Sequence, residues 1–208
     1  MSKKSKRLVS IPNLFTLSRI ALIPCLILVY CLPFKSAGML ASIIFCIAGI
    51  TDWLDGYLAR KLNQSSPFGA FLDPVADKLI IAVALVLITG EYGAVWVTIP
   101  AAIIVSREIA ISALREWMAE MGKRASVSVS YMGKVKTFTQ IIAIIILLWQ
   151  PAQWNNPWVI AGLACMYCAV GLTLWSMLTY MRLAWKALSP EKNIDDNSPK
   201  HLTEGAKF

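Results

Sequence analysis

Long apolar runs, separated by short polar turns, occupy most of this 208-residue chain. Each run approaches the roughly 20 residues that a helix needs to cross the hydrocarbon core of a bilayer. Residues 1–188 are expected to form a single membrane domain, and the polar residues 189–208 a disordered tail. The pattern predicts an all-α integral membrane protein with six transmembrane helices, at about residues 18–33, 39–62, 68–89, 94–121, 133–149 and 158–185.

The segment ahead of the first span mixes polar and apolar side chains at helical spacing. Asn13, Thr16 and Arg19 share one face, and apolar residues such as Leu14 and Phe15 lie opposite. This arrangement predicts an N-terminal amphipathic juxtamembrane helix that lies at the membrane surface. We interpret Arg19 as an interfacial anchor, with binding of a phosphate as the alternative.

Basic residues are distributed unevenly between the two sides of the predicted spans. The turns on one side carry only Lys35. The helix ends and loops on the other side carry Lys3, Lys4, Lys6, Arg7, Arg60, Lys61, Lys123, Arg124, Lys134, Lys136, Arg182 and Lys186. Because basic residues gather on the cytoplasmic side of membrane proteins, both termini are expected to be cytoplasmic.

The composition supports an integral membrane protein and argues against a soluble domain or a nucleic-acid-binding protein. The chain is 57% hydrophobic and 15% charged, too apolar for an ordinary soluble domain. Its net charge of +8 is explained by the topology, so no nucleic-acid partner is expected. The five cysteines lie in or beside apolar stretches and imply no disulfide framework.

Four aspartates, Asp52, Asp55, Asp73 and Asp77, stand inside the apolar runs. Placing each carboxylate there costs roughly 2.5–3.5 kcal/mol, so a compensating positive charge is required. The members of each pair are three or four residues apart and share a helix face. Two divalent cations would balance the four charges, and an all-oxygen ligand set favours Mg²⁺ or Mn²⁺. Paired hard cations of this kind are suited to phosphoryl transfer.

A second group of charged residues, in the fourth and fifth spans, is basic: Arg107, Arg115, Lys134 and Lys136. Arg107 and Arg115 are eight residues apart, close to two helical turns, and so share a face. These side chains are candidates for binding the phosphate of an acceptor substrate. The alternative is that they only anchor the cytoplasmic ends of the helices. Glu108 and Glu116 are expected to orient them.

The stretch from Asp52 to Asp77 reads Asp-x2-Asp-Gly-x2-Ala-Arg-x8-Gly-x3-Asp-x3-Asp. It resembles the signature of the CDP-alcohol phosphotransferase family at all eight fixed positions. Further segments are similar to bacterial members of that family, so the resemblance covers about residues 8–187. These segments are residues 11–19, 106–109, 113–117 and 133–137.

The resemblance implies transfer of the phosphatidyl group of CDP-diacylglycerol to sn-glycerol 3-phosphate, with release of CMP. The uneven distribution of basic residues places the aspartates on the cytoplasmic side, here of a bacterial inner membrane, and the resemblance suggests a homodimer. It implies that the four aspartates are metal ligands and that Asp77 is also the general base. Gly56 and Arg60 are expected to contact the CDP group, and Ser66 is a further candidate for nucleotide binding.

Other functions fit parts of the pattern. Within the family, the acceptor would instead be phosphatidylglycerol, serine or inositol. From another class, an intramembrane cation transporter also uses aspartates in its spans, although it would place them near the middle of the bilayer. An intramembrane aspartyl protease needs only two aspartates and leaves the other two unexplained.

Overall fold

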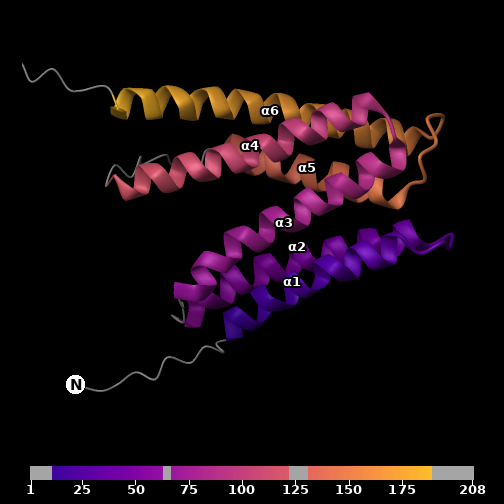
Figure 1. Cartoon of the computed structure of the whole chain (residues 1–208), viewed down its shortest axis with the longest axis horizontal. Helices are drawn as coiled ribbons and strands as arrows, with labels where there is room; N and C mark the ends of the chain where they lie inside the picture. The colour runs from indigo at the N-terminus through magenta and orange to yellow at the C-terminus, as the bar shows by residue number, and fades with distance from the viewer. Residues whose placement is uncertain (1–10, 63–66, 122–130, 189–208) are drawn as a thin grey trace, which may run out of the picture.

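The computed structural model describes residues 11–62, 67–121 and 131–188, and within these ranges every regular element is a helix. The predicted all-α class is therefore confirmed for the described part of the chain (Figure 1). The predicted tail, residues 189–208, lies outside the described residues. The helices are α1 (Ile11–Tyr30), α2 (Ala37–Leu62), α3 (Pro67–Tyr92), α4 (Val95–Glu120), α5 (Tyr131–Trp149) and α6 (Pro157–Leu188).

Local sequence explains where two of these helices begin and end. Asn156 caps α6, because its side-chain oxygen accepts a hydrogen bond from the backbone N–H of Trp158 at 3.0 Å. At the end of α3, the N–H of Gly93 donates to the carbonyl of Thr89 at 3.1 Å. Gly93 has a φ of 55°, a conformation that glycine adopts without strain, and it therefore closes the helix.

α1 is one continuous helix from Ile11 to Tyr30. Between Asn13 and Ile23 the sequence contains neither glycine nor proline, so nothing ends the helix where the first span was expected to begin. Pro24 is accommodated inside the helix. The amphipathic segment and the first span predicted as two parts are therefore a single element.

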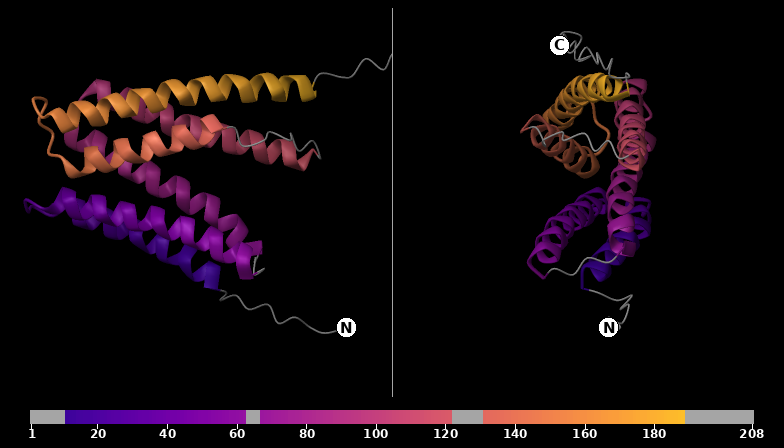
Figure 2. Two further views of the ribbon diagram at one scale, coloured as in Figure 1. Left: turned by 180° about the vertical axis from the view of Figure 1, so that it is seen from behind. Right: turned by 90° about the vertical axis from the view of Figure 1, so that its left-hand side faces the viewer.

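α3 crosses between two groups of helices (Figures 1 and 2). On one side α1 packs against α2, and on the other α6 packs against both α4 and α5. α1 also lies against α3, whereas α2 and α3 have little direct contact with each other. The beginning of α1 and the end of α6 lie at the same end of the molecule (Figure 1).

The core joins the two groups through contacts of α2, α3 and α5. Phe45, Leu85, Ile88 and Leu147 belong to one buried apolar cluster. α2 approaches α5 so closely at Gly38 that an added Cβ would lie 2.5 Å from the carbonyl oxygen of Leu148. A residue without a side chain is therefore required at this crossing.

The outer surface of the described bundle is strongly apolar. Leu28, Val86, Phe138 and Trp175 are all more than 60% exposed, as expected for side chains that face lipid rather than water. Two segments, Val95–Met118 and Pro157–Thr179, are long and apolar enough by length and composition to cross a membrane. Shorter apolar helical stretches cover Thr16–Tyr30, Ala37–Asp52 and Val135–Trp149.

Candidate active site

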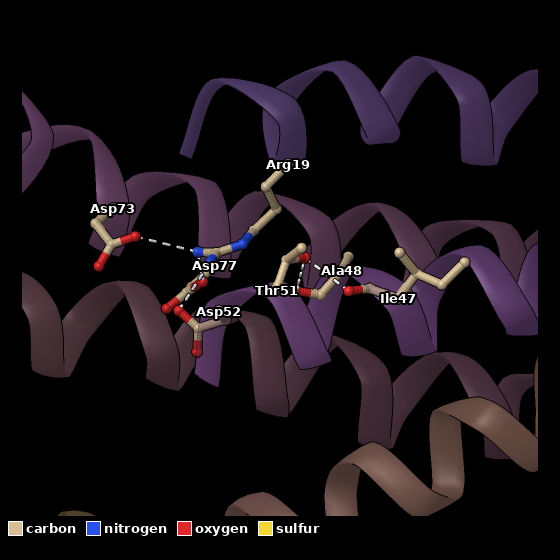
Figure 3. Close-up of polar contacts among 7 residues, drawn as sticks. All are labelled: Arg19, Ile47, Ala48, Thr51, Asp52, Asp73 and Asp77. Atoms are coloured by element: carbon tan, nitrogen blue, oxygen red, sulfur yellow. Dashed lines mark hydrogen bonds and ion pairs between the residues drawn. The ribbon is translucent and has the colours of Figure 1, made fainter. Parts of the chain in front are cut away.

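Arg19 of α1 lies at the centre of an ionic cluster formed with α2 and α3 (Figure 3). One guanidinium nitrogen, Nη2, is 2.9 Å from Oδ1 of Asp52 on α2. The other, Nη1, is 3.2 Å from Oδ1 of Asp73 on α3 and also pairs with Oδ1 of Asp77. Three of the four predicted aspartates are thus brought to one point by an arginine from a third helix.

Helix geometry explains this convergence. Asp73 and Asp77 are one turn apart on α3 and face the same side. α1 packs against both α2 and α3, so its inward side chain at position 19 reaches both of them. Thr51, which precedes Asp52, turns its hydroxyl back onto its own helix and donates to the carbonyls of Ile47 and Ala48 at 2.6 and 2.9 Å (Figure 3). Its polar group is therefore satisfied without taking part in the cluster.

Arg19 is more deeply buried than the three carboxylates that it contacts. The Arg19 side chain is 0% exposed, whereas those of Asp52, Asp73 and Asp77 are 42%, 39% and 39% exposed. The arginine therefore lies on the buried side of the site, and the carboxylates reach the surface. One guanidinium does not balance three carboxylates, so the cluster keeps a negative excess that attracts cations.

The carboxylate oxygens of the cluster are suitable ligands for divalent cations. All three acidic side chains offer oxygen, the ligand type that Mg²⁺ and Mn²⁺ prefer. Within the described part of the chain, no group of three or more acidic, histidine or cysteine side chains is already arranged to hold a metal ion. The carboxylates of the cluster instead each turn one oxygen toward Arg19. Their role as metal ligands stays a prediction.

Interpreting Arg19 as an interfacial anchor was wrong, because its side chain is fully buried and paired with three carboxylates. The sequence did contain a signal for its position. Arg19 lies well inside an apolar helix, and the four aspartates needed a positive partner within the bilayer. Which helix would supply that partner depended on packing that periodicity does not reveal.

A second ionic cluster joins α4, α5 and α6. Glu108 on α4 accepts hydrogen bonds through Oε1 from Nη1 of Arg107 at 2.8 Å and from Nζ of Lys136 at 2.7 Å. Nη2 of Arg107 donates to the hydroxyl of Ser176 on α6 at 2.7 Å. Both bases are more than 90% buried, so they are not merely helix-end anchors in contact with water. Glu108 orients them, as predicted.

One donor of this cluster stays available. The Nε atom of Arg107 is buried and has no hydrogen-bond partner among the described residues. A buried N–H of this kind is costly unless another group accepts its hydrogen bond. It is therefore a natural contact for an oxygen of a bound anion.

The structure does not bring all the predicted basic residues to this point. Arg115 and Glu116 are exposed on α4 and have no ion pair among the described residues. The Lys134 side chain lies outside the described part of α5. The side chains of Asp55 and Arg60, and the surroundings of Gly56, also lie outside it, as does Ser66 altogether.

Lys78 is a contact residue that the sequence pattern did not predict. Its Nζ donates to the hydroxyl of Ser112 and thereby ties α3 to α4. Lys78 directly follows Asp77, and Ser112 is one turn beyond Glu108. The hydrogen bond therefore connects the helix of the acidic cluster to the helix of the basic one. Its only sequence signal was a charged residue within an apolar helix.

Comparison with known proteins identifies the family of this chain. The sequence model of the family described as CDP-alcohol phosphatidyltransferase matches residues 9–175. The chain is also 58% identical over 175 residues to the CDP-diacylglycerol–glycerol-3-phosphate 3-phosphatidyltransferase of Salmonella choleraesuis strain SC-B67. It is 56% identical over 175 residues to the protein of the same name from Escherichia coli strain K12. Each comparison covers 84% of this chain and 94% of the relative. The chain therefore belongs to the CDP-alcohol phosphatidyltransferase family.

Proposed function

We propose that this protein transfers the phosphatidyl group of CDP-diacylglycerol to sn-glycerol 3-phosphate. The observation that carries this proposal is the identity of 58% and 56% to two relatives whose names state that activity, over 94% of their length. A free hydroxyl of the acceptor attacks the phosphorus that bears the diacylglycerol. The bond from that phosphorus to the CMP oxygen breaks, so the products are phosphatidylglycerol phosphate and CMP.

Asp52, Asp55, Asp73 and Asp77 are proposed to hold two divalent cations. Members of this family generally use divalent metal ions, and we propose Mg²⁺ or Mn²⁺ here. Such ions supply positive charge to the phosphate oxygens and to the leaving oxygen of CMP. The convergence of Asp52, Asp73 and Asp77 and their partial exposure support this assignment.

Asp77 is proposed to accept the proton of the acceptor hydroxyl as that oxygen attacks. Its carboxylate is partly exposed, so an acceptor can approach it. On the nucleotide side, Gly56 and Arg60 are proposed to contact the CDP group, with Ser66 as a further candidate. The assignments of Gly56 and Arg60 rest on the family signature, and that of Ser66 rests on its position between the two helices that carry the aspartates.

Arg107 and Lys136 are proposed to bind the phosphate of sn-glycerol 3-phosphate, together with Arg115 and Lys134. The Nε of Arg107, which has no partner among the described residues, and the orientation of both bases by Glu108 support this role for the buried pair. Arg115, which is exposed, is proposed to bind the phosphate more weakly and to attract the anionic acceptor to the site.

We further propose six membrane spans, with both termini and the site in the cytoplasm of a bacterial inner membrane. The apolar surface of the bundle and the common end shared by α1 and α6 support this topology (Figure 1). A homodimer is proposed from the family resemblance. Membership of a transferase family favours an enzyme over the cation transporter considered above.

The direct test is an assay of purified protein with CDP-diacylglycerol and a panel of acceptors, in which CMP and the lipid product are measured. We expect rapid CMP release with sn-glycerol 3-phosphate and little with serine, inositol or phosphatidylglycerol. A different preferred acceptor would overturn the substrate assignment but leave the family intact. Failure to release CMP with any of these acceptors would overturn the proposed activity.

The same assay tests metal dependence. Chelation of divalent ions should abolish activity, and Mg²⁺ or Mn²⁺ should restore it. Ca²⁺ should not, because it favours larger and looser coordination than a phosphoryl-transfer site requires. Full activity after exhaustive chelation would contradict the two-metal proposal.

A further inference from the structure

Arg19 is the most deeply buried charged side chain in the described part of the chain. It is 0% exposed, whereas Lys136 and Arg107 are 4% and 8% exposed. Its guanidinium extends from α1 to carboxylates on two other helices (Figure 3). Removing one partner from a buried ion pair is strongly destabilising, because the other charge is left uncompensated. Arg19 is therefore central to the stability of the cluster.

The same carboxylates are the ligands proposed for the divalent cations. Asp52, Asp73 and Asp77 each direct Oδ1 toward the guanidinium. An oxygen that accepts a hydrogen bond from arginine has less lone-pair capacity for a metal ion. The positive guanidinium also repels a cation that approaches the carboxylates. Arginine and metal ion therefore compete for the same negative charge.

We propose that Arg19 is an internal counter-ion of the metal site, which keeps the three carboxylates together in the metal-free protein and lowers its affinity for the cations. This inference rests on the proposed function, because it assumes that these aspartates bind metal ions. Arg19 acts through the carboxylates and is therefore a positioning residue rather than a catalytic one. It allows three partly exposed acidic side chains to lie beside one another before a metal ion arrives.

An arginine with a purely structural role would give a different combination of changes in stability and metal affinity. If Arg19 only held the helices in place, its removal would distort the site, and both stability and metal affinity would fall. For a counter-ion the two effects have opposite signs. Removal destabilises the metal-free protein, because the carboxylates then repel one another, but it strengthens metal binding, because a competing charge is gone.

The experiment compares the parent protein with Arg19→Gln, Arg19→Lys and a matched control, Arg182→Gln. Arg182 is exposed on α6, so its substitution removes one positive charge without touching the cluster. Unfolding of the full chain in detergent is followed by intrinsic fluorescence of its eight tryptophans. Binding of Mn²⁺ is measured separately, from the electron paramagnetic resonance signal of the free ion. Neither measurement depends on activity.

In chelator, Arg19→Gln should unfold at a temperature lower by about 5 °C or more. Its affinity for Mn²⁺ should be higher by about tenfold or more, the effect of losing one charge-assisted hydrogen bond that competes with the metal. Saturating Mn²⁺ should reduce the difference in stability, because a ligand that binds more tightly stabilises more. Arg182→Gln should match the parent in both measurements.

Arg19→Lys keeps the charge but not the forked geometry, so it should lie between the parent and Arg19→Gln in both measurements. It also provides the test if Arg19→Gln does not fold in chelator. Equal or weaker Mn²⁺ affinity in the variant that folds would overturn the counter-ion role while leaving the metal site intact. If the parent itself binds no Mn²⁺, the proposed metal site fails, and this inference fails with it.

Discussion

At the scale of single residues, the roles proposed for the aspartates of the acidic cluster differ. Asp77 is the aspartate that the family signature assigns as the base, and it is about two-fifths exposed while Arg19 pairs with it from the buried side. Its position is therefore fixed, and its outer face can receive a hydroxyl. Asp52 and Asp73 share the arginine contact but have no proposed role in proton transfer.

Asp77→Asn should lower kcat by about 10²–10⁴-fold, the usual effect of losing a general base, and by more if a metal ion is also lost. The amide keeps the size of the side chain but does not accept the proton. Steady-state kinetics and Mn²⁺ binding on the same preparation separate the two contributions. Asp73→Asn is the matched control and should weaken metal binding together with turnover. A near-normal kcat for Asp77→Asn would refute its assignment as the base.

Replacing Arg107 with Gln should raise KM for sn-glycerol 3-phosphate and leave KM for CDP-diacylglycerol little changed. Losing one charge-assisted contact costs about 1.5–3 kcal/mol, or roughly a 10- to 150-fold loss of kcat/KM for that acceptor. Lys136→Gln should behave in the same way. Exposed Arg115, changed to Gln, should have a smaller effect that salt suppresses.

Unphosphorylated glycerol provides the control for these variants. It lacks the negative partner, so the parent should use it poorly and Arg107→Gln hardly less well. Glu108 also pairs with Arg107, so part of any loss is expected to be structural and shared by both acceptors. An equal loss with both acceptors would mean that the basic cluster only supports the fold.

The sequence located the aspartates but not their partner. Spacings of three and four residues place each acidic pair on one helix face, and the need for positive charge follows from their apolar surroundings. Which basic residue lies against the aspartates depends on which helices touch. Contact of α1 with both α2 and α3 is a property of the packed bundle, and no local pattern encodes it.

At the scale of helices, an end is predictable where one residue has a capping side chain or a backbone conformation that closes the helix. The turn expected at residues 90–93 begins later, because α3 continues to Tyr92 and only Gly93 has the positive φ that closes it. The apolar pattern alone does not distinguish a polar residue inside a helix from one in a turn. For the same reason, the polar face of the first helix appeared to be a separate segment.

Substitution of Gly38 tests the crossing of α2 and α5. An added Cβ would lie 2.5 Å from a backbone oxygen of α5, which does not move as a side chain does. Gly38→Ala should therefore lower the unfolding free energy by about 1–3 kcal/mol, the usual cost of overpacking. Tryptophan fluorescence during thermal unfolding measures the change.

Gly49, also within α2, is the matched control. An added Cβ there meets nothing within 4 Å. Gly49→Ala should leave stability unchanged or raise it by up to about 1 kcal/mol, because alanine favours the helix. If both variants were equally stable, the close approach at Gly38 would not contribute to packing.

Considered as a whole, the bundle has two different ends. The ionic cluster of Arg19 involves the early residues of α3, whereas Tyr30, Lys35, Glu91 and Gln150 line an open hollow of about 330 Å³ at the opposite end, where α1, α3 and α5 end. The proposed topology places the first end in the cytoplasm. The uneven distribution of basic residues supports this orientation, although packing alone does not determine it.

Cysteine labelling tests this orientation. In a cysteine-free variant that keeps activity, Lys35→Cys and Arg182→Cys each place one exposed thiol at a different end of the bundle. A membrane-impermeant maleimide added to right-side-out vesicles should label position 35 and spare position 182. Inverted vesicles should give the opposite result. Labelling of both positions from the same side would contradict six spans with cytoplasmic termini.

The hydrogen bond between Lys78 and Ser112 limits how the gene can change. Asp77 and Lys78 are adjacent on α3, about 100° apart around its axis, so one meets Arg19 while the other meets α4. Insertion or deletion of one codon between Lys78 and the end of the helix would rotate both contacts by about 100° relative to the core residues that follow. Length variation among descendants should therefore accumulate in the connections between helices, and α3 should keep its length while its lipid-facing side chains vary.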